Sequence, residues 1–338
     1  MKFLEILQKA IVCKWSDIHL TTDKNIYYRQ NNRLNIWEDE FFKREDFREV
    51  IENTLNETQK ILFRQNKVID YAYEFDNRRF RINIYMIYKG YGMAIRLIND
   101  NVKPIENFYQ QKVLQDILHN DNGLILICGA TGTGKSTTLA SMIEYINQNK
   151  SKHIITLEEP IEYVFTNKKS LIHQREYHVD FENFSEAIKM AMRQDPDVIM
   201  VGEIRDTETM KACLNAAETG HLVLGTLHAS SVIEAIIRME SFFNQEQIEA
   251  ISMQIASSLN SIIIQKLIST IDENLVCCMD ILLATTAVKN LISKNQLSQL
   301  ISQMQLNRQN GMQFIQDDIE KLVKAKLIDE KIAKKYIG

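Results

Sequence analysis

Cysteine and long apolar runs are both scarce in this 338-residue sequence. None of the five cysteines stands at the C-x-x-C spacing of a zinc site; they are Cys13, Cys128, Cys213, Cys277 and Cys278. This pattern argues against a cysteine zinc centre and favours reduced thiols in a cytoplasmic compartment. No uninterrupted apolar run approaches the ~20 residues of a membrane-spanning helix, so direct membrane insertion is not expected.

An excess of positive charge is also missing. The formal net charge is −4, which provides no general attraction for nucleic acid, and no nucleic-acid partner is expected. The chain is 45% hydrophobic and 25% charged, which is ordinary for a soluble globular protein. Its length favours two domains over one.

Proline and glycine are few and unevenly placed. Only three prolines and eleven glycines occur, and seven of the glycines fall between Gly123 and Gly225. Residues 1–100 predict a small α+β domain, with an amphipathic first helix and a polar helical segment near 45–66. Its strand-like segments are 25–30, 33–38, 71–75, 78–88 and 92–98, with Gly90 and Gly92 expected to form the last turn. Residues 101–108, which include Pro104, are the expected linker.

Residues 109–338 follow a different pattern, in which apolar strands alternate with helices. The expected strands are 124–128, 153–158, 198–201 and 221–228, and the expected helices are 135–149, 184–194 and 207–219. Strands that are apolar throughout predict a parallel sheet covered on both faces, and therefore an α/β fold. The chain from about residue 231 onward is expected to be mostly helical.

A glycine-rich loop lies between the first of these strands and its helix. Residues 129–136, GATGTGKS, fit the P-loop pattern G-x-x-x-x-G-K-[ST]. In such a loop, backbone amides and a helix N-terminus bind phosphate oxygens. Lys135 is expected to reach the β- and γ-phosphates of ATP, and Ser136 to bind Mg²⁺. The alternative is a glycine-rich turn that matches by chance, which the flanking strand and helix disfavour.

An acidic residue ends the buried strand 198–201. Glu203 follows Gly202 at the carboxyl end of that strand, where ligands bind in an open parallel sheet. It is expected to contact the water shell of the metal and to polarise the attacking water; the alternative is a solvated carboxylate. Glu158 and His228 end other predicted strands in the same way, whereas the position of His221 at the start of its strand favours a structural role.

The segment MRQDPDVIMVGEIRD, residues 192–206, resembles the signature of the bacterial type II/IV secretion-system ATPases. The resemblance runs nearly end to end and is greatest to the members that retract type IV pili. It includes SDIHL at 16–20, RFRIN at 79–83, TLEEPIEYVF at 156–165, AETGHLVLGTLHASS at 217–231 and GMQ at 311–313. The chain departs from common family patterns at Lys289 and Asn260, where the family often has arginine.

This resemblance implies a RecA-like P-loop ATPase domain with a smaller N-terminal PAS-like domain, assembled as a homo-hexamer. It places the phosphate-binding loop at Gly129, Ala130, Thr131, Gly132, Thr133, Gly134, Lys135, Ser136 and Thr137. It implies Glu203 as the catalytic glutamate, Glu158 as an acid near the γ-phosphate, and a histidine motif around His221 and His228. Arg81 and Arg96, with Arg79 as a further candidate, match arginines that reach nucleotide. From the residues alone, these arginines could equally be solvated or ion-paired.

The expected function is a hexameric motor that hydrolyses ATP with Mg²⁺ and powers type IV pilus retraction in twitching motility. It would be cytoplasmic and peripheral at the inner membrane, acting on a pilus platform protein there. The alternatives are an accessory retraction ATPase, a pilus-extension or secretion ATPase, a nucleic-acid translocase, and a structural ring subunit without hydrolysis. The absent tetracysteine motif favours retraction over extension, and the net charge disfavours the translocase.

Overall fold

The computed structural model describes residues 2–30, 33–76, 78–98, 102–272, 274–329, 331, 333 and 334. The chain forms two compact units; the first comprises Met1–Asn101, Pro160–Val164 and Glu176–Asp180, and the second Val102–Glu159, Phe165–Arg175 and Phe181–Gly338. Of the expected linker 101–108, residue 101 lies outside the described residues, while Ile105 and Phe108 are buried in the core of the second unit. Over the described residues, every helix is too short or too polar to cross a lipid bilayer.

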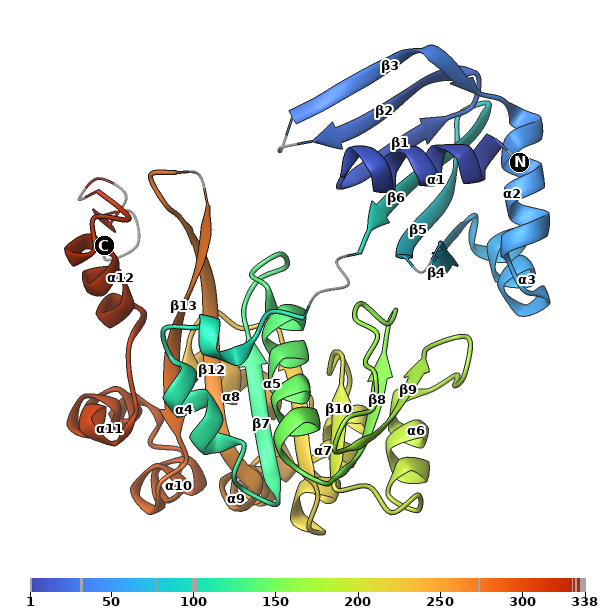
Figure 1. Ribbon diagram of the computed structural model, residues 1–338. Coiled ribbons are helices and arrows are strands. Elements are labelled where there is room, and N and C mark those ends of the chain that lie inside the picture. The colour runs from blue at the N-terminus through green and yellow to red at the C-terminus, as the bar shows by residue number, and fades with distance from the viewer. Residues whose placement is uncertain are drawn as a thin grey trace. The chain divides into compact units, whose positions relative to one another are not determined.

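The first unit contains a six-stranded antiparallel sheet with the order β3-β2-β1-β6-β5-β4 (Figure 1). The strands are β1 (Asp17–Thr21), β2 (Lys24–Gln30), β3 (Arg33–Phe42), β4 (Val68–Phe75), β5 (Arg78–Ile87) and β6 (Gly90–Leu97). The helices are α1 (Lys2–Cys13), α2 (Arg44–Thr54) and α3 (Glu57–Asn66). In α1, Phe3, Ile6, Leu7 and Ala10 are buried, because residues three and four apart share one face of a helix. The three helices pack on one face of the sheet and form a single core with it.

Strand β1 and the helical segment near 45–66 both differ from the sequence-based expectation. Strand β1 was not expected, although its five residues alternate between polar and apolar side chains and its burial alternates in the same way. The helical segment near 45–66 is two helices, because Asn56 starts the second one: its side chain accepts a hydrogen bond from the Gln59 backbone N–H at 2.8 Å.

The expected glycine turn between β5 and β6 is wrong. The turn is made by Tyr88 and Lys89, and Lys89 has a positive φ of 65°. Both Gly90 and Gly92 lie inside β6. Gly90 is required for close approach, since an added Cβ would lie 2.6 Å from the Cβ of Thr22. Thr22 in turn accepts a hydrogen bond from the Tyr91 N–H at 2.8 Å.

The two residues should therefore respond in opposite ways to substitution. Gly90→Ala is expected to lower the free energy of unfolding by about 1–3 kcal/mol, because the methyl group overpacks against Thr22. Lys89→Gly should leave stability unchanged or raise it by up to about 1 kcal/mol, since glycine removes the left-handed backbone cost. Urea denaturation of the two variants beside the wild type provides the measurement. A Gly90→Ala protein as stable as the wild type would contradict this packing.

The second unit contains a seven-stranded sheet with the order β13-β12-β7-β11-β10-β8-β9. Its strands are β7 (Gly123–Cys128), β8 (His153–Glu158), β9 (Leu171–Glu176), β10 (Val198–Val201), β11 (Leu222–Leu227), β12 (Leu259–Ser269) and β13 (Leu275–Leu283). Strands β12, β7, β11, β10 and β8 are mutually parallel, and β13 is antiparallel to β12. The predicted α/β class with a parallel sheet is confirmed.

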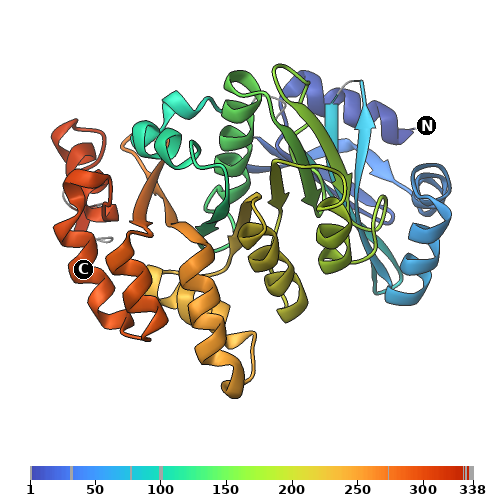
Figure 2. The same ribbon diagram turned by 90° about the horizontal axis from the view of Figure 1, so that it is seen from below.

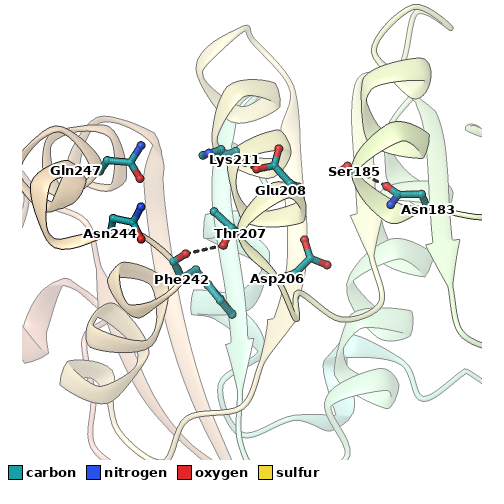
Figure 3. Close-up of a pocket in the computed structure, with 9 residues that line it drawn as sticks. All are labelled: Asn183, Ser185, Asp206, Thr207, Glu208, Lys211, Phe242, Asn244 and Gln247. Atoms are coloured by element: carbon teal, nitrogen blue, oxygen red, sulfur yellow. Dashed lines mark hydrogen bonds and ion pairs between the residues drawn. The ribbon is translucent and has the colours of Figure 1, made fainter.

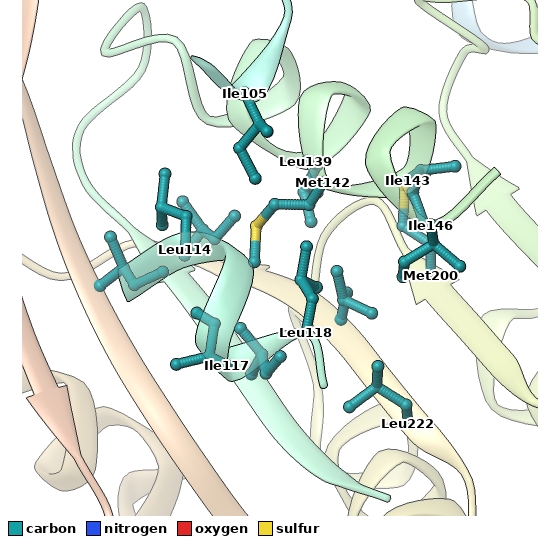
Figure 4. Close-up of a cluster of buried hydrophobic side chains, with 14 of the residues drawn as sticks. Ile105, Leu114, Ile117, Leu118, Leu139, Met142, Ile143, Ile146, Met200 and Leu222 are labelled. Carbon is teal, nitrogen blue, oxygen red and sulfur yellow. The ribbon is translucent and has the colours of Figure 1, made fainter. Parts of the chain in front are cut away.

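Helices cover both faces of this sheet (Figures 1 and 2). They are α4 (Gln111–Ile117), α5 (Lys135–Asn149), α6 (Phe184–Ala191), α7 (Thr207–Glu218), α8 (Val232–Ser241), α9 (Ile248–Ser258), α10 (Thr286–Ser293), α11 (Leu300–Leu306) and α12 (Ile315–Lys324), with short 3₁₀ turns at Ile105–Asn107, Gln245–Gln247, Leu297–Gln299 and Arg308–Asn310. Helices α4 and α5 pack on one face around the apolar cluster of Figure 4. Helices α7, α8 and α9 lie on the opposite face, with α6 beside α7. The sheet is therefore buried on both sides, which accounts for its continuous apolar strands.

The expectation of a mostly helical chain after residue 231 is only partly right, since β12 and β13 complete the sheet there. Their apolar runs are long enough to be read as buried helix, and periodicity alone cannot separate the two. Neighbouring Cys277 and Cys278 pack into different clusters, as alternation along a strand requires. All five cysteines are free thiols.

The GMQ segment at 311–313 is attached to the edge strand of this sheet. Gln313 forms a single antiparallel bridge with Ile281 of β13, with backbone N···O distances of 2.9 and 3.2 Å. Its side chain also donates to the Met279 carbonyl and to Asp318, both at 3.0 Å. The helical C-terminal segment is thus fixed to β13 by backbone and side-chain hydrogen bonds together.

Candidate functional site

The glycine-rich loop joins β7 to α5, as predicted. Gly132 and Gly134 have φ angles of 81° and 83°, a backbone region that glycine adopts without steric cost. The loop closes on itself through the Thr133 hydroxyl, which donates to the Ala130 carbonyl at 2.9 Å. The Lys135 ammonium donates to the carbonyls of Gly129 at 2.8 Å and Ala130 at 3.0 Å. The lysine charge is therefore held over the loop that α5 follows.

The acidic end of the site is built by three parallel strands, β8, β10 and β11. Gly202 donates its backbone N–H to the Leu157 carbonyl at 2.8 Å, and an added Cβ would lie 3.3 Å from the same oxygen. On the other side, the Thr226 hydroxyl donates to the Gly202 carbonyl at 2.5 Å. A side chain at 202 would therefore crowd the neighbouring strand, and the backbone that carries Glu203 is held from both sides.

Glu203 and His228 are brought together at this edge. The His228 Nε2 lies 2.8 Å from one Glu203 carboxylate oxygen, and Arg205 donates to the other at 2.6 Å. Arg205 also pairs with Glu159 at 2.8 Å. The four side chains form one charged cluster.

The charge of this cluster sets the ionisation of Glu203. Burial acts to raise the pKa of Glu203, but it is outweighed by the hydrogen bond and charge of Arg205 and by the charges of His228 and Lys135. The net effect is a lowered pKa, so the carboxylate is ionised at neutral pH. Because the Lys135 charge contributes to the lowered pKa of Glu203, the acidic edge and the glycine-rich loop interact electrostatically.

Glu158 ends β8, the strand on the other side of β10 from β11. It is 7% exposed, and its Oε1 accepts from the Thr156 hydroxyl at 2.6 Å and from the Gln174 amide at 3.1 Å. His221 lies at the opposite end of β11, where its Nδ1 is 3.0 Å from the Ala216 carbonyl. This contact with the end of α7 agrees with a structural role for His221.

The candidate arginines lie in the first unit and are ion-paired there. Arg81 and Arg96 are register neighbours on β5 and β6, on the sheet face opposite the helices. Arg81 pairs with Asp70 at 2.6 Å and Arg96 with Asp17 at 2.7 Å. Arg79 pairs with Glu176 in the same unit. These carboxylates offset the repulsion between neighbouring guanidinium groups.

Sequence reasoning found no role for Arg205 and Asp206. Arg205 holds Glu203 and Glu159, and Asp206 begins α7 by accepting from the Thr209 N–H at 2.8 Å. An aspartate directly before a predicted helix is a capping signal that could have been recognised. The pairing of Arg205 with Glu159 depends on two strands being adjacent, which the local sequence does not reveal.

Removal of the Arg205 charge should change the pH dependence of the site. A group with a lowered pKa keeps its charge until the pH falls through that value. In Arg205→Gln the opposing effect of burial remains, so the Glu203 pKa should rise and the acid limb of kcat/KM should move to higher pH. ATPase rates across an acidic pH series give the measurement, with Arg193→Gln as an exposed control. An unmoved acid limb would show that Arg205 does not tune Glu203.

A cavity of about 540 Å³ lies close to this edge, beside the starts of α6 and α7 (Figure 3). It is lined by Asn183, Ser185, Asp206, Thr207, Glu208, Lys211, Phe242, Asn244 and Gln247, and the Thr207 hydroxyl donates to the Phe242 carbonyl at 2.5 Å. Neither Glu203 nor a residue of the glycine-rich loop lines it. Across the described part of the chain, no three His, Cys, Asp or Glu side chains are grouped to hold a metal by themselves.

The parallel sheet, the loop with Lys135 after β7, and the acid Glu203 after β10, with β11 between these two strands, together define a RecA-like P-loop ATPase. The chain belongs to the type II/IV secretion system protein family, whose model matches residues 2–313.

Three known proteins show how closely the chain follows its family. It is 39% identical to the twitching motility protein of Neisseria gonorrhoeae, over 86% of this chain and 78% of that protein. It is also 39% identical to the type IV pilus retraction ATPase PilT of Pseudomonas aeruginosa, over 84% and 83% of the two chains. The crystal structure of the pilus retraction motor PilT with bound ADP superimposes with a TM-score of 0.88, covering 98% of this chain and 95% of that chain at 39% identity.

Proposed function

We propose that this chain hydrolyses ATP as a homo-hexameric motor that powers type IV pilus retraction and twitching motility. The observation that carries the proposal is its similarity, in sequence and structure, to the PilT retraction motor over nearly the whole chain. The presence of Lys135 and of an ionised Glu203 in one site supports active hydrolysis. A structural ring subunit would need neither residue.

The phosphates of ATP are assigned to the glycine-rich loop. Backbone amides of residues 129–137 and the N-terminus of α5 bind the phosphate oxygens, and Lys135 moves from its loop carbonyls to the β- and γ-phosphates. Glu203 accepts a hydrogen bond from the attacking water and aligns it with the γ-phosphorus. His228 and Glu158 respond to the γ-phosphate from neighbouring strand ends.

The residues at this site suit Mg²⁺, which prefers oxygen ligands and keeps several waters. Ser136 would provide a hydroxyl oxygen and Glu203 a carboxylate that contacts the metal's water shell. The lack of a three-residue ligand group among the described residues suits this ion, since substrate phosphates supply much of its coordination. When bound, Mg²⁺ neutralises phosphate charge.

The motor is assigned to the cytoplasmic side of the inner membrane, where it acts on a pilus platform protein. The names of the pilus-motor relatives support an association with the type IV pilus machinery. Hydrolysis changes the contacts made to nucleotide, and those changes drive rotations that remove pilin subunits from the base of the pilus.

A deletion strain complemented with either the wild-type gene or Lys135→Ala tests the function. The deletion and the Lys135→Ala strain are expected to retain abundant surface pili but to lose twitching, whereas the wild-type gene restores movement. Unchanged piliation and movement in the deletion strain would remove the retraction assignment. Loss of surface pili would instead identify an extension ATPase, and residual retraction an accessory one.

A further inference from the structure

Strand β12 extends beyond the strand that carries the glycine-rich loop. The last register pair between β12 and β7 is Ile264 with Cys128, so Gln265 lies beside Gly129, where the loop begins. Gln265 is 1% exposed and directly follows the three buried isoleucines 262–264. A buried amide requires hydrogen-bond partners, and those of Gln265 lie in the loop and in the helix that follows it.

The Gln265 side chain joins the two sides of the phosphate-binding segment. Its Nε2 donates to the Thr133 carbonyl at 2.6 Å, and its Oε1 accepts from the Thr138 hydroxyl at 2.8 Å. The orientation of the amide follows from chemistry, because a carbonyl oxygen can only accept and must face the NH₂ group. Thr133 belongs to the loop and Thr138 to the first turns of α5, so one side chain fixes the loop relative to the helix.

The loop also packs tightly against the backbone of this strand. An added Cβ at Gly129 would lie 2.7 Å from the Gln265 carbonyl oxygen, and one at Gly134 would lie 3.1 Å from its Nε2. Both glycines therefore allow the close contact that brings Thr133 within reach of the amide. With glutamate at 265, a carboxylate would face the Thr133 carbonyl, so two acceptors would meet without a proton between them. It would also place negative charge beside the phosphate site.

We propose that Gln265 is a positioning residue of the ATPase site, which holds the glycine-rich loop in its phosphate-binding shape before nucleotide arrives. The inference rests on the proposed nucleotide site at residues 129–137. Without the amide, the loop populates other shapes, and the apparent affinity falls in proportion to the competent fraction. Gln265 does not touch the reacting atoms, so its loss should weaken nucleotide binding more than it slows the chemical step.

Gln265→Met removes both hydrogen bonds while keeping the side-chain length. We expect the Kd for ADP, measured by isothermal titration calorimetry on the full chain, to rise about tenfold, as for a competent fraction reduced to about one tenth. The KM for ATP should rise by a similar factor, with kcat changed less than about threefold. The rise in Tm caused by saturating ADP should shrink accordingly.

Asn147→Leu provides a matched control, because Asn147 is a fully buried amide at the other end of α5. Its Nδ2 donates to the Thr166 carbonyl at 2.9 Å, so the control also removes a buried hydrogen bond to a backbone carbonyl. Both variants should lower Tm, but only Gln265→Met should weaken ADP binding.

The outcomes separate the inference from the function on which it rests. A wild-type protein that fails to bind ADP overturns the proposed nucleotide site. If the Kd for ADP and the KM for ATP are the same in the wild type and in Gln265→Met, the positioning role is overturned, whatever the change in Tm. If Gln265→Met does not fold, the Thr138→Val variant provides the test, because it removes only the hydroxyl that binds Gln265. A rise of about threefold in the Kd for ADP supports the positioning role, and an unchanged Kd overturns it.

Discussion

Replacement of Glu203 by glutamine is expected to reduce kcat for ATP hydrolysis by at least about 100-fold while leaving ATP binding close to that of the wild type. Glutamine keeps the shape of the side chain but carries no charge to orient and polarise water. The lowered pKa of Glu203 keeps its carboxylate ionised in the wild type at neutral pH. The variant also loses the ion pair with Arg205 and the carboxylate oxygen that lies beside the His228 Nε2. Phosphate release under saturating ATP, together with calorimetric binding of ATP, provides the two measurements.

Glu208→Gln is a suitable control for this experiment, because Glu208 is an exposed acid on the first turn of α7. It should hydrolyse ATP at the wild-type rate. Turnover by Glu203→Gln near that of the wild type would remove Glu203 from the chemical step. A variant that neither binds nor hydrolyses would instead show that Glu203 supports the shape of the site.

Lys135→Ala is expected to weaken nucleotide binding by about 10- to 100-fold and to abolish measurable hydrolysis. Lys135 carries its ammonium directly over the loop, and charge-assisted hydrogen bonds to phosphate each contribute about 1.5–3 kcal/mol. Alanine removes the charge but leaves the helix start intact, so Tm without nucleotide should change little. Titration of ADP and ATP by calorimetry measures the affinity.

Lys150→Ala controls for the loss of a lysine from the same region. Lys150 directly follows α5 at its other end, and its Nζ donates to the Leu118 carbonyl at 2.6 Å. The Lys150→Ala variant should bind nucleotide with the affinity of the wild type. Equal affinity in Lys135→Ala and the wild type would mean that this loop is not the phosphate site.

Much of the second unit could be predicted from its sequence, because short apolar strands are separated by helices with clear ends. Strands β8 and β10 and helix α5 begin and end at the predicted residues. Strands β12 and β13 were missed, since long apolar runs also fit buried helices. In the first unit, a turn was assigned to glycines that serve packing instead.

The site shows the same division between local and long-range information. The glycine-rich loop and Glu203 were predicted because their positions after strands are visible in the chain. The contacts of Arg205 and Gln265 depend on which strands are neighbours in the sheet. Arg205 binds Glu159, which is 46 positions away in the sequence, and Gln265 binds Thr133, which is 132 positions away. The sequence places Arg81 and Arg96 on strands, but it does not show that carboxylates from adjacent strands pair with them.

The single bridge between Gln313 and Ile281 has a consequence for solubility. An edge strand presents unpaired N–H and C=O groups, which are a template for strands of other molecules. At Ile281 the chain's own GMQ segment occupies these groups, and the Gln313 side chain binds the neighbouring Met279 carbonyl as well. At this point of β13 the segment therefore stands where a strand of another molecule would otherwise pair.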